Sequence, residues 1–234
     1  MSDDLDTLDP DVYEKAVLPL DPEGAVAIKR GIHCIDVAAP AADVMRAFTA
    51  VLEDPGRRFG LIELLRTPDR VGRPYSVGER FQGRYIIEKA VEEELAKLPL
   101  PGLMSSLSRA FAALSPDPLL ELVEDRMLSD YGVITDLVTS PASGQPYRLR
   151  YEYLDGTPIA GFLSIECLAT GPATCRFTQL SEYQEQGIEI LLVYGTAVLK
   201  MHERVFYEMV KQSADRIGAA ILGTDIPEAY YRPV

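Results

Sequence analysis

Few side chains in this sequence could do acid–base chemistry. The chain has only two histidines, His33 and His202, and an imidazole titrates near neutral pH, so either could act as a general acid or base at a cavity wall. His33 shares one face of a strand pattern with Ile35 and Val37, and His202 lies near the edge of an apolar helical stripe. Each has a simpler interpretation: His33 as a buried histidine bonded to a neighbouring group, and His202 as a surface or rim histidine.

The last long helical pattern carries two further candidates for contact with a ligand. Tyr194 and Met201 fall on its apolar stripe together with Ile190 and Val198. A tyrosine at such a place offers a ligand an apolar ring and one hydroxyl. The alternative is a core tyrosine that bonds to a carbonyl of the sheet.

A hairpin around the DGTP turn supplies the remaining candidates. A loop of two or four residues places the odd-numbered residues 149–153 on one sheet face with the even-numbered residues 160–166. Neither face is purely apolar, so either Arg150 and Glu152 or Tyr151 and Tyr153 line a cavity, where a few polar groups orient an apolar ligand. The alternative is ordinary cross-strand pairing on a solvated face, and a bulge would swap the two faces.

The sequence lacks the motifs of the common cofactor and metal sites. It has no P-loop, no GxGxxG after a strand, no GxSxG elbow, no HExxH and no Cys/His cluster. Its cysteines, Cys34, Cys167 and Cys175, form no CxxC pair and lie in apolar stretches, which predicts buried free thiols. We therefore expect no metal and no cofactor.

Charge and hydropathy restrict the partners. The formal net charge of -13 disfavours binding to nucleic acid and to anionic membrane surfaces. No apolar run reaches the roughly 18 residues of a membrane span, so we expect no membrane insertion. The N-terminal MSDDLDTLDPD lacks the basic and apolar regions of a signal peptide, which predicts a cytoplasmic protein. The sequence leaves a homodimer open.

The hydrophobic pattern predicts an α+β fold. One short helix and one long C-terminal helix flank a series of strands joined by turns that suit antiparallel neighbours. A curved antiparallel sheet of about seven strands would then grip the long helix, leaving a cavity between them. The predicted strands are 31–37, 59–66, 75–87, 119–128, 131–138, 147–154, 159–168 and 174–183, and the predicted helices are 41–52 and 187–218.

The pattern also divides the chain into segments. We expect an acidic N-terminal extension at 1–25, one main domain at 26–222 and a C-terminal tail at 223–234. A helical insertion at 88–116 interrupts the strands. Its apolar residues 103–114 could form a lid over the cavity, with flanking prolines and Gly102 as hinges. It could equally be a helical hairpin packed on the sheet, or a membrane-docking helix, although that would need a basic face.

Three segments resemble the START-like superfamily, also called SRPBCC. IDVAAPAADVMRAF (35–48) is similar to its opening strand, small-residue-plus-Pro turn and short helix, with Met45 where a large aromatic often stands. VGERFQGRY resembles its glycine-containing early strand, and ILLVYGTAVLKMHERVFYEMVKQSADRIG resembles its long terminal helix. The resemblance covers residues 31–220 apart from the stretch 88–115, and it implies a helix-grip fold with an internal cavity. Members of the family bind sterols, phospholipids, polyketides, plant hormones and aromatics, and some are enzymes.

The leading functional hypothesis is a protein that binds or carries an apolar or aromatic small molecule in an internal cavity. One alternative is an enzyme of the polyketide cyclase or aromatase kind, using groups such as His33, His202, Tyr194 or Arg150. Another is a protein-interaction module without a small ligand, which would expose apolar residues in 103–114. The candidate ligand-binding residues are Tyr194, Met201, His33, Arg150, Tyr151 and Tyr153.

Overall fold

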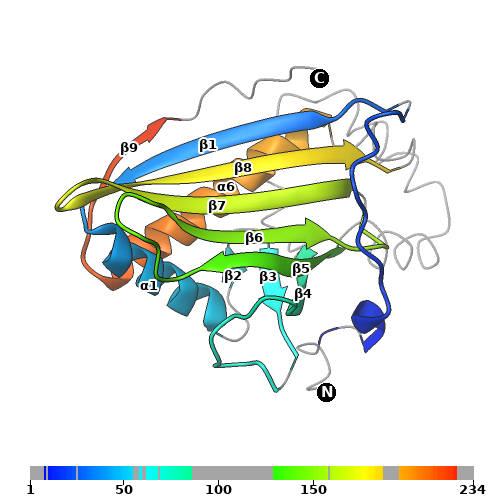
Figure 1. The fold of residues 1–234 in the computed structure, drawn as a ribbon, viewed down its shortest axis with the longest axis horizontal. Helices are drawn as coiled ribbons and strands as arrows, with labels where there is room; N and C mark the ends of the chain where they lie inside the picture. The colour runs from blue at the N-terminus through cyan, green and yellow to red at the C-terminus, as the bar shows by residue number, and fades with distance from the viewer. Residues whose placement is uncertain are drawn as a thin grey trace, which may run out of the picture.

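One large open sheet dominates the structure, a computed structural model that describes residues 8, 10–24, 26–54, 58–59, 62–67, 69–85, 129–157, 159–186 and 195–225. Within these ranges, nine antiparallel strands lie in the order β2-β3-β4-β5-β6-β7-β8-β1-β9 (Figure 1). Their bounds are β1 Lys29–Val37, β2 Arg58–Phe59, β3 Ile62–Leu65, β4 Arg80–Tyr85, β5 Ser129–Val138, β6 Tyr147–Tyr153, β7 Ile159–Gly171, β8 Thr174–Glu185 and β9 Ile221–Asp225.

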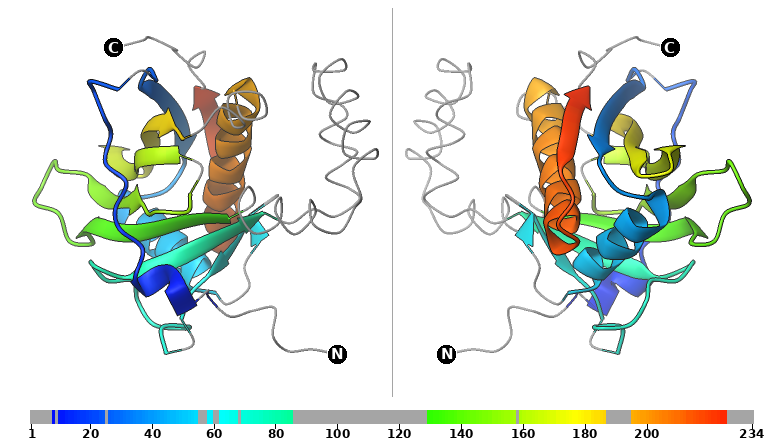
Figure 2. Two further views of the ribbon diagram at one scale, coloured as in Figure 1. Left: turned by 90° about the vertical axis from the view of Figure 1, so that its right-hand side faces the viewer. Right: turned by 90° about the vertical axis from the view of Figure 1, so that its left-hand side faces the viewer.

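Within the described ranges, two α-helices cover one face of this sheet. They are α1 (Ala41–Glu53) and α6 (Gly195–Arg216), and they also contact each other. Seen from its ends, the sheet curves around them, so that they lie on its inner face (Figure 2). This arrangement confirms the α+β class and the antiparallel sheet covered by a long C-terminal helix. No helix in the described ranges is long and apolar enough to cross a membrane.

The first strand and helix form as their sequence patterns predict. In β1, His33, Ile35 and Val37 are all buried, which confirms that they share one face of the strand and shows that this face is the inner one. Pro40 directly precedes α1. Its fixed φ suits the start of a helix, and its missing N–H cannot continue the strand pairing. The helix then buries one apolar stripe against the sheet and α6, comprising Ala41, Val44, Met45, Ala47, Phe48, Val51 and Leu52.

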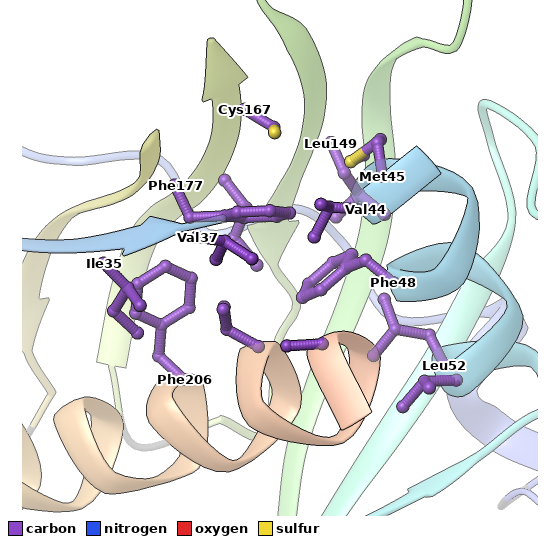
Figure 3. Packing of buried hydrophobic residues seen from close by; sticks show 14 of the residues in the cluster. Ile35, Val37, Val44, Met45, Phe48, Leu52, Leu149, Cys167, Phe177 and Phe206 are labelled. Atoms are coloured by element: carbon purple, nitrogen blue, oxygen red, sulfur yellow. The ribbon is translucent and has the colours of Figure 1, made fainter. Parts of the chain in front are cut away.

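The main apolar core lies between α1, the C-terminal half of α6 and the inner face of the sheet. Figure 3 shows its side chains pointing toward one another from both layers. Phe48 of α1 and Phe177 of β8 pack with ring centroids 5.3 Å apart. Phe206 and Val210 of α6 are almost completely buried in the same cluster. Burying a side chain of this size contributes about 1.5–3 kcal/mol, so this region anchors the helix to the sheet.

An N-terminal strap, residues 16–24, crosses the outer face of the sheet. In Figure 1 it runs in front of the strands, while α6 lies behind them. The Leu18 N–H donates to the Tyr153 carbonyl at 2.9 Å, and the Gly161 N–H donates to the Leu18 carbonyl at 3.0 Å. Farther along, the Gln184 amide exchanges two hydrogen bonds with the backbone of Asp21. The strap therefore ties together the ends of β6, β7 and β8.

The sheet is larger than the sequence predicted. Nine strands replace about seven, and one of the added strands is β9, Ile221–Asp225, which pairs with β1 across the point where the C-terminal tail was expected to begin. The predicted strand 59–66 is a tight hairpin of β2 and β3. The predicted strand 75–87 is shortened to β4, since Gly78 turns the chain with a φ of 85°. The predicted insertion at 88–116 and strand at 119–128 lie outside the described residues.

The cysteines follow their prediction with one exception. Cys167 and Cys175 are buried free thiols on the inner face, as expected. Cys34 is only half-buried, because it alternates with His33 and Ile35 along β1 and so lies on the outer face, where its sulfur is 3.7 Å from the Thr178 hydroxyl.

Candidate functional site

A cavity of about 70 Å³ lies between the inner face of the sheet and the helices. Val205, Phe206 and Met209 of α6 form one wall, and Leu52 of α1 closes one end. These positions recur at helical spacing, which turns them to the same side of α6. The cavity lies between the sheet and the helices, where the helix-grip arrangement predicts it.

The floor of the cavity comes from the β6–β7 hairpin. Leu149 pairs with Ile165, and Tyr151 pairs with Leu163, so all four side chains share the inner face. The predicted pairing of odd residues with even ones is therefore wrong. Tyr151 and Leu163 are both odd-numbered, which means that an odd number of residues separates the paired positions. A loop of two or four residues, as assumed from the DGTP turn, would have shifted every side chain of one strand to the other face.

Arg150 lies on the outer face of β6, away from the cavity. Its guanidinium carbon is 3.7 Å from the centroid of the Phe162 ring, and it forms an ion pair with Glu152 at 3.6 Å. This is the cross-strand pairing of a partly solvated face that the sequence left as an alternative. We correct the prediction that Arg150 contacts the ligand, because the sheet lies between its side chain and the cavity.

Tyr151 and Tyr153 are the members of this hairpin that face the helices. Tyr151 lines the cavity and packs edge-to-face on Phe81, with centroids 4.9 Å apart. Tyr153 is fully buried and packs edge-to-face on Tyr151, at 5.5 Å. Burial raises the pKa of both phenols far above the ordinary 10. Both hydroxyls therefore stay protonated at neutral pH and can donate a hydrogen bond.

Tyr75 closes another part of the wall and is held in place by its neighbours. Its hydroxyl donates to the Leu52 carbonyl at 3.2 Å. The Arg66 guanidinium lies over the ring, 3.9 Å from its centroid, and is itself paired with the buried carboxylate of Glu79. This contact fixes the ring of Tyr75, and the occupied hydroxyl makes it a structural part of the wall.

Two polar side chains interrupt the otherwise apolar lining. Gln179 reaches the cavity from β8 and Asp130 reaches it from β5. Gln179 is only 4% exposed, and within the described residues its Oε1 has no hydrogen-bond partner. A buried polar atom without a partner costs about 1–3 kcal/mol, so this amide oxygen can gain from a ligand or a water molecule.

Gln179 belongs to a group of buried polar side chains that we call the polar row: His33, Gln179 and Ser181. His33 on β1 is directly opposite Gln179 on β8, and Ser181 is two residues farther along β8. His33 is 2% exposed, and burial lowers the pKa of its imidazole, so the ring is neutral at pH 7. In the part of the chain that the structure describes, neither ring nitrogen nor the Ser181 hydroxyl has a hydrogen-bond partner.

The other predicted site residues lie beyond what the structure describes. Tyr194 falls outside the described residues. Met201 and His202 belong to α6, but their side chains fall outside as well. The predicted lid at 103–114 is likewise outside. Of the six candidates, the structure thus brings Tyr151, Tyr153 and His33 to the inner face and places Arg150 on the outer face.

Sequence reasoning missed Gln179 and Ser181. The signal was present, because the alternation in TCRFTQLSEYQE places Phe177, Gln179 and Ser181 on one face of β8. Chemically, the arrangement can bury an apolar group and exchange hydrogen bonds with a polar one. Among the described residues, no group of three or more His, Cys, Asp or Glu is placed to hold a metal ion.

Comparison with solved structures shows which known proteins have a similar fold. Zhui aromatase/cyclase from Streptomyces sp. R1128 aligns with a TM-score of 0.50 at 8% identity, covering 81% of this chain and 96% of that one. Norcoclaurine synthase from Thalictrum flavum, in complex with a transition-state analogue, aligns at a TM-score of 0.45 and 12% identity, covering 83% and 99%. A START superfamily protein from Mycobacterium smegmatis aligns at 0.40 and 13%, covering 81% and 97%.

Structural neighbours at such low sequence identity indicate a shared fold and say nothing about activity. No protein-family model and no curated protein sequence matches the chain. The open antiparallel sheet and the long C-terminal helix on its inner face agree with the fold of the aromatase/cyclase. The fold of this chain is therefore a helix-grip fold, as the resemblance of its sequence to the START-like superfamily implies.

Proposed function

We propose that this protein binds or carries a small apolar or aromatic molecule between the sheet and α6. One observation carries the proposal: a cavity lies there, its lining is mostly aliphatic and aromatic, and few polar groups reach it. Binding sites for small molecules commonly have this composition. The phenol of Tyr151 and the amide of Gln179 would orient the ligand, while Leu163, Ile165 and Phe206 would contact its apolar part.

The volume of the cavity limits what it holds without rearrangement. At about 70 Å³ it is much smaller than the roughly 300–1,000 Å³ of sites for drug-sized ligands. An apolar cavity of about 150 Å³ is known to bind benzene, so even a single ring, the smallest suitable probe, requires the wall to move. Met209 is the side chain best suited to move, because a methionine has three rotatable bonds and adapts to irregular spaces.

The first test is to compare native and denaturing mass spectra of freshly purified protein. A mass excess in the native spectrum that disappears on denaturation shows a bound molecule, and its mass begins the identification. The second test measures the binding of toluene by amide chemical-shift titration, which also shows where toluene binds. Toluene that shifts no amide of β6, β7 or α6, together with an absent mass excess, would overturn the proposal.

A pair of variants of β7 tests the location. Leu163→Phe adds volume to the floor of the cavity, and we expect the affinity for toluene to fall about tenfold or more, since overpacking costs about 1–3 kcal/mol. Leu168→Phe makes the same change on the same strand at a side chain that is 42% exposed, and it should leave the affinity unchanged. Equal affinities for the two variants would place the binding elsewhere.

An enzyme of the cyclase or aromatase kind is the second candidate. It is favoured by one observation: Asp130 and Tyr151 line the same cavity, and the Asp130 charge helps to raise the pKa of Tyr151. A carboxylate base and a phenol donor at one wall could assist proton transfer. The test is incubation with a short poly-β-ketone and detection of the loss of water by mass. Turnover that is equal in wild type and Asp130→Asn would exclude this role for Asp130.

A further inference from the structure

The polar row lies beside an apolar cavity, and four of its buried polar atoms have no hydrogen-bond partner among the described residues: both ring nitrogens of His33, the Gln179 Oε1 and the Ser181 hydroxyl. Burial has removed these atoms from water, and none of the described residues replaces the hydrogen bonds that water would make with them. Resting on the proposed function, we infer that the ligand carries a neutral hydroxyl group, an alcohol or a phenol, that hydrogen-bonds to Gln179 and His33 while its apolar part fills the cavity.

Strand pairing makes the row one continuous surface. Directly opposite residues on antiparallel strands have Cβ atoms about 4.5–5.5 Å apart, which applies to His33 and Gln179. Ser181 lies about 7 Å farther along β8, at the rise of two residues. Gln179 is the member of the row that lines the cavity, and His33 is its direct neighbour across the strand pair, so a group bound to the amide would also meet the His33 ring.

The charges around the cavity exclude an anion as the favoured partner. None of the described residues that line the cavity is Lys or Arg, and one of them is Asp130. His33 is neutral, because its burial lowers the pKa of the ring. The Lys29 ammonium, at the start of the same strand as His33, is already held by the buried Glu185 at 2.5 Å. A carboxylate or phosphate would therefore leave water without gaining a positive partner.

The hydrogen-bonding capacity of the row favours a hydroxyl over a carbonyl. A neutral imidazole has one donor and one acceptor nitrogen, an amide offers both functions, and a serine hydroxyl does too. A ketone or an ester would accept hydrogen bonds only, and would leave the acceptors of the row unpaired. An alcohol or phenol both donates and accepts, so it can join Gln179 and His33 in one chain of hydrogen bonds.

The experiment uses three ligands with one apolar body: toluene, p-cresol and p-toluate. Dissociation constants are measured by amide chemical-shift titration of the full chain at pH 7.5. The informative quantity is the ratio of the toluene constant to the p-cresol constant, because it isolates the hydroxyl. We compare wild type with Gln179→Leu and with His33→Leu, each of which removes one proposed hydrogen-bond partner of the ligand hydroxyl. Thr178→Val is the matched control, since Thr178 neighbours Gln179 on β8 but lies on the outer face.

We expect the ratio to fall about tenfold in Gln179→Leu, to fall also in His33→Leu, and to stay unchanged in Thr178→Val. Toluene itself should bind both inner-face variants at least as well as it binds wild type, which shows that they fold and keep the cavity. A ratio that is the same in all four proteins would overturn the inference while leaving the proposed function intact. Tightest binding of p-toluate would also overturn it. Failure of every ligand to bind wild type would remove the proposed function and the inference together.

Discussion

The two ends of the inner face are made by the same strands but have opposite characters. At one end, β1 and β8 contribute Ile35, Val37 and Phe177, which pack on Phe48 of α1. At the other end, the same strands contribute the polar row, whose buried atoms lack protein partners in the described part of the chain. The change from one character to the other occurs within two residues, between Ile35 and His33.

This difference indicates how the fold separates two tasks. The apolar end fastens α1 and the C-terminal half of α6 to the sheet, and the burial of its apolar side chains stabilises the fold. The polar end gives up hydrogen bonds to water, so it lowers stability and yet offers the groups that could recognise a ligand. Removing side chains at the two ends should therefore change stability in opposite directions, and the following measurements test that contrast.

The largest effect is expected at the apolar end. Phe177→Ala removes a fully buried ring from contact with Phe48, and it should lower the free energy of unfolding by about 3–5 kcal/mol. Urea denaturation measures the change. Leu168→Ala, at an exposed position of the neighbouring strand β7, is the control and should cost about 0.5 kcal/mol or less. A loss at Phe177 no larger than that at Leu168 would contradict the assignment of the apolar end as the anchor.

The next effect is a pH dependence at the polar end. Burial lowers the pKa of His33 in the folded state, whereas the unfolded chain keeps the ordinary value near 6.5. Below pH 6.5 the unfolded chain binds a proton that the folded chain does not, so stability falls by up to about 1.4 kcal/mol per pH unit. His33→Leu should lose this part of the slope between pH 7.5 and 5, as measured by urea denaturation at each pH. Gln179→Leu, which alters the same row without removing a titrating group, should keep it.

The smallest effect compares two buried hydroxyls. Ser181→Ala removes an unpartnered hydroxyl and should raise the free energy of unfolding by about 1 kcal/mol. Thr157→Val removes a hydroxyl that accepts from the Tyr131 N–H at 2.9 Å, so it should lower the same quantity by about 1–3 kcal/mol. Thermal unfolding of both variants gives the two signs. If Ser181→Ala destabilises the protein as Thr157→Val does, its hydroxyl has a partner in solution and the polar end is satisfied.

Sequence patterns predicted the apolar end well, because it depends on local alternation. The inner face of β1 and the stripe of α1 follow from periods of two and 3.6 residues, and both are confirmed by burial. The long terminal helix and the antiparallel strands could also be predicted from such patterns. Each of these features is encoded within a single element.

The polar end could be predicted only in part, because alternation along β8 gives the shared face of Gln179 and Ser181 but not the strand that lies beside it. His33 becomes part of a row only when β8 lies beside β1, and no local pattern gives that register. The prediction that Arg150 faces the cavity was wrong for a similar reason. A change of one residue in the length of the loop decides which side chains of the strand point to each face of the sheet. The short strand β9 was missed, since its glycine suggested an end and its pairing with β1 is distant in sequence.

The position of β1 in the sheet has a consequence for how the chain is made. Its neighbours in the sheet are β8 and β9, both near the far end of the chain. A ribosome adds about 5–20 residues per second, so β1 waits on the order of ten seconds for β8 to emerge. The inner strands can meanwhile pair with their sequence neighbours, from β2 to β8 in order. Folding during synthesis should therefore add the first strand only after β8 is in place, and β9 then completes the sheet on the other side of β1.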